Sequence, residues 1–460
     1  MGEQVGGSLP YHPLRLVPGH IRNYRNSSIL LPATGAVIPQ RADFFLHLSV
    51  GSHPGPLPRC FLSRPANRLL CGCYPNTRAA KLFQLTISVR NAHAGCTILA
   101  DGYFPGRSTA GIYVAPLDPN NLTHLAAVPK HLFGFDSKYE WERWGEKNEY
   151  TGIAWIEGPW MFKRNGRYYI EFSASGTQWL SYASGIYSSK SPLGPFTYSP
   201  RNPLLRKTTG IVTGPGHGSV VQGPDGNWWV FYTIVMSNPP GGRRIGMDPI
   251  AFDANGNPYT NGPSETPQWA PGLVADPVHN GDSGSIAVSV NKLRAMHGQS
   301  SFSSERPGHE AAYATDDSNG TIWQPAENDA QPTLTVDLVA PTEFETGQYF
   351  QIDSIRIEFA TGSGGPRMVP GAAPAGPPPA PTGSAAFRYK IETSIDGKQF
   401  TTVLDKTNNE GTRYTEFAEI PPTRCRYVRL TITDWPHRAG SPLGITEFTV
   451  FGKALPTPMQ

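Results

Sequence analysis

Trp155-Ile156-Glu157-Gly158-Pro159-Trp160 sets one carboxylate among aromatic and apolar residues. Two runs follow it in order, the alternating Gly166-Arg167-Tyr168-Tyr169-Ile170 and the glycine-flanked Gly216-His217-Gly218-Ser219. Runs rich in aromatic and β-branched residues between turn residues predict strands. The sequence therefore predicts a glutamate at the head of one strand and a histidine one strand pair later.

Glu157 has the surroundings that a general acid needs. Its apolar neighbours disfavour the charged form of a carboxyl group. A carboxyl group that keeps its proton can protonate a leaving oxygen, which is what cleavage of a glycosidic bond requires. The alternative is a strand-end carboxylate that pairs with an arginine. The spacing of the following motifs favours the acid.

Residues 110–258 resemble family 43 glycoside hydrolases at four ordered motifs. These are Gly111-Ile112-Tyr113-Val114, Ile156-Glu157-Gly158-Pro159, Ser191-Pro192-Leu193-Gly194-Pro195-Phe196 and Gly214-Pro215-Gly216-His217-Gly218-Ser219. The resemblance implies an all-β fold, a five-bladed β-propeller with its active site at the mouth of the central channel. It also implies inverting hydrolysis of terminal β-xylosyl or α-L-arabinofuranosyl residues of plant polysaccharides.

The resemblance also implies roles for individual residues. Glu157 takes the place of the general acid, and His217 that of the channel histidine, which holds a calcium ion through water. Arg243 or Arg244 lies where the family places a substrate-contacting arginine, and we take Arg244 as the candidate. A surface guanidinium on a strand edge is an equal alternative for it. No cofactor is required, and a structural Ca²⁺ is an expectation.

The general base has no clear counterpart in residues 1–95, which we interpret as an irregular, degenerate N-terminal segment. Alternation typical of strands occurs there only at residues 44–50 and 82–89. Asp43 is followed by Phe44 where the family motif has proline. Either the first blade is incomplete or its coding sequence was disrupted. The alternative function is therefore a carbohydrate-binding protein without turnover.

The C-terminal part, residues 291–455, resembles a discoidin-type (coagulation factor 5/8 type C) sandwich. The matching runs include Leu334-Thr335-Val336-Asp337-Leu338, Ile352-Asp353-Ser354-Ile355-Arg356-Ile357 and Arg426-Tyr427-Val428-Arg429-Leu430-Thr431-Ile432. Alternation with a period of two in these runs predicts an antiparallel β-sandwich. We expect Trp323 in its core and Trp435 in a loop, as a sugar-binding candidate. The Pro/Gly-rich insert 362–384 is predicted to be a flexible loop.

The propeller is expected to span residues 96–290, with its last strand near residues 284–289. In the 460 residues, 49 glycines and 46 prolines fit a turn-rich all-β protein. A net charge of +3 without a Lys/Arg run excludes a nucleic-acid footprint. No apolar run spans a membrane, and the start of the chain lacks a signal sequence. The family resemblance nevertheless implies a secreted protein, with which sequons at Asn26, Asn121 and Asn319 are compatible. We expect a monomer whose partner is an oligo- or polysaccharide.

Overall fold

The computed structural model describes three early strands and most of the chain from residue 111 onward. The described residues are 45–48, 83–88, 96–101, 111–152, 154–236, 242–293, 301–339, 348–361, 385–437 and 442–456. Asp43 and the insert 362–384 lie outside them. None of the helices among these residues is long and apolar enough to cross a membrane.

The first sheet is antiparallel and contains six strands in the order β1-β2-β3-β4-β5, with β6 beside β4. Its strands are β1 (Phe45–Leu48), β2 (Phe83–Ser88), β3 (Cys96–Asp101), β4 (Gly111–Asp118), β5 (Asn121–Leu125) and β6 (Lys130–Gly134). β1 and β2 fall where the N-terminal segment alternates. The short η1 (Glu140–Glu142) follows β6.

Two four-stranded antiparallel sheets come next, each formed by strands that are consecutive in the chain. One contains β7 (Glu157–Arg164), β8 (Arg167–Ala174), β9 (Ala183–Ser189) and β10 (Thr197–Tyr198). The other contains β11 (Gly216–Gln222), β12 (Trp228–Met236), β13 (Gly242–Phe252) and β14 (Pro258–Tyr259). β7 and β11, the first strands of their sheets, lie against each other.

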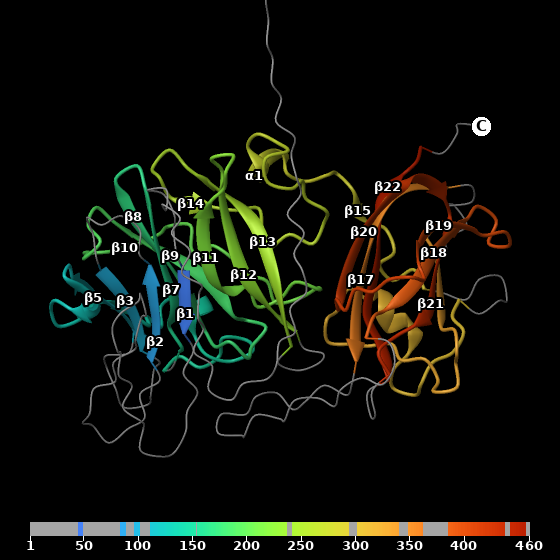
Figure 1. Ribbon diagram of the computed structural model, residues 1–460, viewed down its shortest axis with the longest axis horizontal. Helices are drawn as coiled ribbons and strands as arrows, with labels where there is room; N and C mark the ends of the chain where they lie inside the picture. Colours follow the sequence, from blue (N-terminus) through green and yellow to red (C-terminus); the bar gives the residue numbers. More distant parts are fainter. Residues whose placement is uncertain are drawn as a thin grey trace, which may run out of the picture. The chain divides into compact units, whose positions relative to one another are not determined.

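The two four-stranded sheets have the form of propeller blades, since each is an antiparallel meander and their first strands lie against each other, while β2 and β3 of the first sheet lie against β7 (Figure 1). The all-β prediction is therefore confirmed. Among the described residues the propeller part contains three sheets, whereas the resemblance implied five blades. After β14 the chain forms only the short α1 (Pro277–Asn280) before the sandwich begins.

The expectation of a last propeller strand near residues 284–289 was wrong. β15 (Ile286–Ala287) pairs with Phe451 and Gly452 of the sandwich strand β22. Val288, directly after it, is buried in the sandwich core. The sandwich therefore includes residues that lie before position 290.

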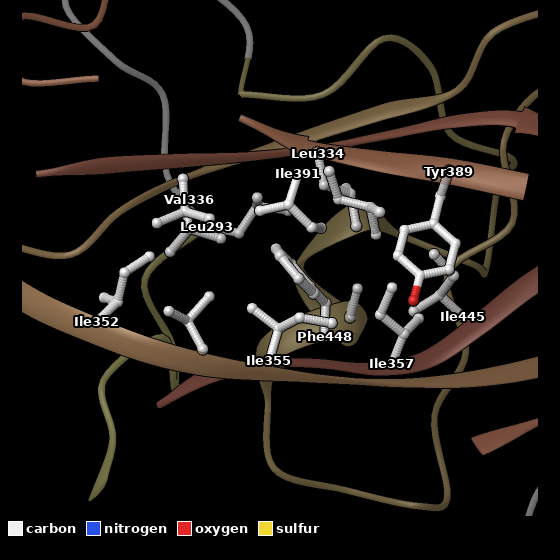
Figure 2. Close-up of a cluster of buried hydrophobic side chains, with 14 of the residues drawn as sticks. Leu293, Leu334, Val336, Ile352, Ile355, Ile357, Tyr389, Ile391, Ile445 and Phe448 are labelled. Carbon is white, nitrogen blue, oxygen red and sulfur yellow. The ribbon is translucent and has the colours of Figure 1, made fainter. Parts of the chain in front are cut away.

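The sandwich consists of two four-stranded antiparallel sheets, β15-β22-β17-β20 and β16-β21-β18-β19. Its remaining elements are η2 (Ala311–Thr315), β16 (Thr333–Asp337), β17 (Phe350–Thr361), β18 (Arg388–Ser394), β19 (Thr401–Lys406), β20 (Thr415–Cys425), β21 (Tyr427–Asp434) and β22 (Leu443–Ala454). Leu334 and Ile391 from one sheet point toward Ile355 and Phe448 from the other (Figure 2). Trp323 is fully buried in this core, as predicted.

Candidate active site

Three neighbouring strands bring Glu157 and His217 together. Glu157 begins β7 and stands opposite Ser173 of β8. The Ser173 hydroxyl oxygen accepts the backbone N–H of His217 at 2.6 Å, which fixes β11 to the same point. A Cβ atom on Gly158 would lie 3.3 Å from His217 Nδ1, so the imidazole lies directly against the backbone next to the glutamate. The structure therefore joins the two residues that the sequence motifs singled out.

The Glu157 carboxylate is held by one donor on each oxygen. The Trp155 indole N–H donates to Oε2 at 2.8 Å, and the Tyr182 hydroxyl donates to Oε1 at 2.7 Å. Tyr182 is fully buried, and this burial, together with the negative charge of Glu157, raises the pKa of its hydroxyl well above its usual value. Tyr182 therefore remains a neutral donor at physiological pH. The Glu157 carboxyl group is thus fixed in position by two neutral donors.

The Gly216-His217-Gly218 triplet leaves no room for larger side chains beside the histidine. His217 adopts a φ of +53°, a left-handed conformation that non-glycine residues seldom adopt. A Cβ atom on Gly216 would overlap the Tyr182 ring. A Cβ atom on Gly218 would come within 2.9 Å of Glu171 Oε1. The backbone of β11 thus packs closely against residues from β8 and from the turn before β9.

Glu171 is a second carboxyl group behind this cluster, and it was missed in the sequence. It lies on β8 two residues before Ser173, on the same face of the strand, and is fully buried. Burial raises its pKa to about 8, although the Ser184 and Ser173 hydroxyls and the Gly218 amide favour the charged form. Among the described residues, however, none of these groups meets the geometry of a hydrogen bond to either Glu171 oxygen, so their effect is weaker than that of burial. Glu171 is therefore a neutral carboxylic acid near neutral pH.

An aromatic wall adjoins the Glu157 carboxylate. The Trp144 ring centroid lies 6.3 Å from that of Trp155 and 6.0 Å from that of Trp179. Indole faces of this kind stack on the apolar face of a sugar ring. Trp155 therefore both binds the carboxylate and forms part of this wall.

Arg243, and not Arg244, lies on the side of this cluster. Its Nη2 donates to the Thr177 carbonyl at 2.9 Å and also to the Thr177 hydroxyl, in the loop between β8 and β9. Its positive charge also acts on Tyr182, where it offsets a small part of the rise in the pKa of the hydroxyl. The sequence alone does not distinguish the two arginines, because the face that each presents depends on the register of β13. The candidate predicted from the sequence was Arg244.

Arg244 points away from the cluster, since consecutive strand residues face opposite sides. Its Nε donates to the Thr415 hydroxyl at 3.0 Å and lies 3.7 Å from Glu358 Oε2. These are residues of the sandwich strands β20 and β17. A substrate-binding role for Arg244 at the Glu157 cluster therefore does not fit its contacts.

Trp435 follows β21 and is half-buried against the sandwich core. Its ring centroid lies 4.7 Å from that of His437. It is not part of the Glu157 cluster, and its proposed role in sugar binding concerns the sandwich alone.

The residues around His217 do not form a metal site built from side chains. Among the described residues, no group of three or more His, Cys, Asp or Glu side chains is placed to hold a metal ion. A calcium ion bound to His217 through water stays a prediction, and no chemical step is assigned to it here.

A general base for an inverting reaction would have to face Glu157 across bound sugar. Glu171 cannot supply it, because a fully enclosed carboxyl group has no access to a water at the sugar. Asp43, the early aspartate considered from the sequence, lies outside the described residues. No general base is therefore assigned among the described residues.

Two family models match separate parts of the chain. Residues 98–258 match the family described as "Glycosyl hydrolases family 43", and residues 376–447 match the "F5/8 type C domain". The first range contains the Glu157 cluster described above. The second contains the sandwich strands from β18 to the start of β22.

Known proteins are similar over shorter stretches. Beta-D-galactofuranosidase xynD of Aspergillus niger is 39% identical over 89 residues, 19% of this chain and 26% of that protein. Xylosidase/arabinosidase 43A of Humicola insolens is 41% identical over 110 residues, 24% of this chain and 31% of that protein. A crystal structure of a thermostable family-43 glycoside hydrolase is 25% identical, with a TM-score of 0.37, over 43% of this chain and 62% of that one. The chain thus spans less than a third of the length of either curated relative.

Proposed function

We propose that this chain, with a glycosyl hydrolase family 43 domain at residues 98–258 and an F5/8 type C domain at residues 376–447, hydrolyses glycosidic bonds of plant polysaccharides. Glu157 is the general acid of this proposal. The observation that supports it best is the pair of hydrogen bonds that Trp155 and Tyr182 donate to the Glu157 carboxylate, beside His217. A strand-end glutamate with a purely structural role would pair with an arginine, whereas both oxygens here meet neutral donors.

The two donors differ in what they allow at the oxygen that each contacts. The Trp155 indole can only donate, so Oε2 must remain an acceptor. The Tyr182 hydroxyl can both donate and accept, so Oε1 can carry a proton without losing its partner. In the proposed reaction the proton leaves the carboxyl group for the leaving oxygen as the glycosidic bond breaks. Both donors then stabilise the carboxylate that forms.

The sugar that is released remains part of the proposal. The resemblance favours terminal β-xylosyl or α-L-arabinofuranosyl residues, removed with inversion at the anomeric carbon. The relatives' names include xylosidase, arabinosidase and β-D-galactofuranosidase, so a galactofuranosyl residue is a third candidate. We expect slow turnover, because loss of a general base commonly removes about 10²- to 10⁴-fold of the rate.

The test is hydrolysis of paired substrates by the parent chain and by Glu157→Gln. The dinitrophenolate group of a dinitrophenyl glycoside leaves without acid assistance. The leaving oxygen of a xylo-oligosaccharide or arabino-oligosaccharide must be protonated. We expect Glu157→Gln to lose about 10²- to 10⁴-fold on the oligosaccharide and far less on the dinitrophenyl glycoside. Glu410→Gln, a change at an exposed glutamate of the sandwich, is the matched control and should leave both rates unchanged. Equal losses on both substrates would contradict the acid role.

A carbohydrate-binding protein without turnover is the second candidate, because no general base is assigned. It predicts no hydrolysis of either substrate by the parent chain, together with retarded migration in a gel that contains xylan or arabinan. We further propose that the sandwich contributes to this binding through Trp435 and that the chain acts as a monomer outside the cell. Trp435→Ala should weaken retention in the gel without changing hydrolysis of a soluble dinitrophenyl glycoside.

A further inference from the structure

The chain contains three sequons, and their burial separates one of them from the others. They begin at Asn26, Asn121 and Asn319, and none has proline in the middle position, which would prevent N-glycosylation. Asn26 lies outside the described residues, and Asn319 is 2% exposed. Asn121 is an exposed residue. Among the described residues, the folded chain therefore leaves room for a glycan at Asn121 and not at Asn319.

Asn121 lies at the end of a hairpin that its own turn residues fix. It begins β5 and stands opposite Asp118, the last residue of β4. The backbone N–H of Asn120 donates to Asp118 Oδ1 at 2.8 Å, which is the bond of an Asx turn. Pro119 and Asn120, between the two strands, are exposed as well. The hairpin therefore holds Asn121 at the surface.

β5 is an open edge of the first sheet. It is the last strand in the order β1-β2-β3-β4-β5, so β4 is its only strand partner among the described residues (Figure 1). An open edge can pair with a strand of another chain, and proteins commonly protect such edges with charged residues or proline. The β5 sequence, Asn-Leu-Thr-His-Leu, contains no Asp, Glu, Lys or Arg and no proline. This edge therefore lacks both kinds of protection.

Exposed apolar side chains add to the tendency of this edge to associate. Leu125, the last residue of β5, is 40% exposed, and Val128, between β5 and β6, is 87% exposed. Alternate residues of a strand face the same side, so Asn121 and Leu125 share a face and lie about 13 Å apart. A branched glycan on Asn121 would extend over that distance. It would cover Leu125 and the edge of β5 with hydroxyl groups.

We propose that Asn121 carries an N-linked glycan, which covers the open edge of β5. The donor is a lipid-linked diphospho-oligosaccharide. The new bond joins Asn121 Nδ2 to the anomeric carbon of the first N-acetylglucosamine, and the bond between that carbon and the diphosphate breaks. The amide gives up one proton, and the lipid diphosphate leaves. The inference rests on the proposed location outside the cell and is independent of catalysis at Glu157.

The experiment is production of the full chain in a yeast behind an added secretion leader, so that entry into the secretory pathway does not depend on the chain itself. Every chain carries Asn26→Gln. Peptide N-glycosidase F removes N-linked glycans and leaves aspartate where the glycosylated asparagine stood. We expect peptide mass spectrometry to find aspartate at position 121 after digestion and asparagine at position 319. An undigested sample is the control for spontaneous deamidation.

Two variants of the sequon test the acceptor. Thr123→Ala should abolish the change at position 121, and Thr123→Ser should keep it, because the sequon accepts either hydroxyl residue. Chain that stays inside the cell is digested and measured in the same way, so the result does not depend on export. Asparagine at position 121 in the digested starting chain would overturn the proposal, whatever the variants do.

Light scattering of the purified chains at rising concentration tests the role of the glycan. Asn121→Gln removes the glycan without adding a charge, and we expect it to scatter at a lower concentration than the starting chain. Adding Leu125→Lys to this variant should restore the later onset, because a charge on an open edge opposes pairing with another chain. Equal onset in the starting chain and in Asn121→Gln would overturn the covering role.

Discussion

Replacing Glu171 by glutamine tests the buried carboxyl group behind the histidine. Glu171 is fully buried on β8, and its pKa is raised from 4.5 to about 8 by burial. Glutamine keeps the shape of the neutral acid and cannot ionise. The change therefore removes one titrating group and leaves the packing against Gly218 and Ser173 nearly as it was.

The sign of the effect follows from the two pKa values. Below pH 4.5 the group is protonated in both the folded and the unfolded chain, and its contribution to stability is fully present. Between pH 4.5 and about 8 the unfolded chain releases the proton and the folded chain keeps it, so rising pH favours unfolding. Each pH unit in this window costs about 1.4 kcal/mol. From pH 5 to pH 7 the loss from Glu171 alone is about 3 kcal/mol.

The assay is urea unfolding of the parent, Glu171→Gln and Glu410→Gln at several pH values from 5 to 8. We expect the parent and the exposed-site control Glu410→Gln to lose stability with the same slope as the pH rises. Glu171→Gln should lose about 3 kcal/mol less than the parent between pH 5 and pH 7. Only the difference in slope is the readout, because the buried amide has its own cost, which does not depend on pH. Identical slopes for parent and variant would refute the reasoning.

Three further changes test the contacts described above. Tyr182→Phe removes the hydroxyl that donates to Glu157 at 2.7 Å. We expect kcat for an oligosaccharide to fall about tenfold or more with little change in KM. An unchanged kcat would show that this hydrogen bond does not support the proposed acid. Asn319 is 2% exposed, and the two N–H bonds of its amide are shared among three oxygens, those of Ile211, Thr213 and Val235. Asn319→Asp should therefore cost about 3 kcal/mol or more in urea unfolding and exceed the cost of Asn319→Ala. Gly158→Ala introduces a side chain at a φ of +60° beside His217, and its melting curve should show a loss of about 1–2 kcal/mol.

The burial of Asn319 also bears on the sequon that begins there. A glycan on this amide would have no room, because the side chain is enclosed in the folded chain. The sequon at Asn319 is therefore not a modification site of the folded protein. A three-residue sequon does not show whether its asparagine is buried. From the sequence alone, the sequon at Asn319 was therefore compatible with a secreted, glycosylated protein.

The parts of the site that lie on local strand patterns could be predicted. Glu157 and His217 each stand in a short run with its own turn signals, and the order of the runs places them on the first strands of two consecutive sheets. Their proximity then follows from blade geometry. The core position of Trp323 was predictable for the same reason, because it lies in a motif whose neighbours alternate regularly.

The parts that depend on contacts between distant elements could not be predicted. Tyr182 reaches Glu157 from the turn before β9, and nothing in its own sequence neighbourhood points to a carboxylate. The choice between Arg243 and Arg244 depends on which face of β13 each occupies. β15 has two residues, and its partners on β22 lie more than 160 positions further along the chain, so its sheet could not be inferred.

The crowding around the histidine triplet also limits how this protein can change. The Tyr182 ring occupies the space that a side chain at position 216 would need, and the Glu171 carboxyl group lies against position 218. A larger residue at either position therefore needs a smaller or displaced neighbour. Substitutions here must therefore occur as linked pairs, 216 with 182 and 218 with 171. A side chain added at position 216 alone would overlap the Tyr182 ring, whereas a library that varies positions 216 and 182 together could change the shape of the site.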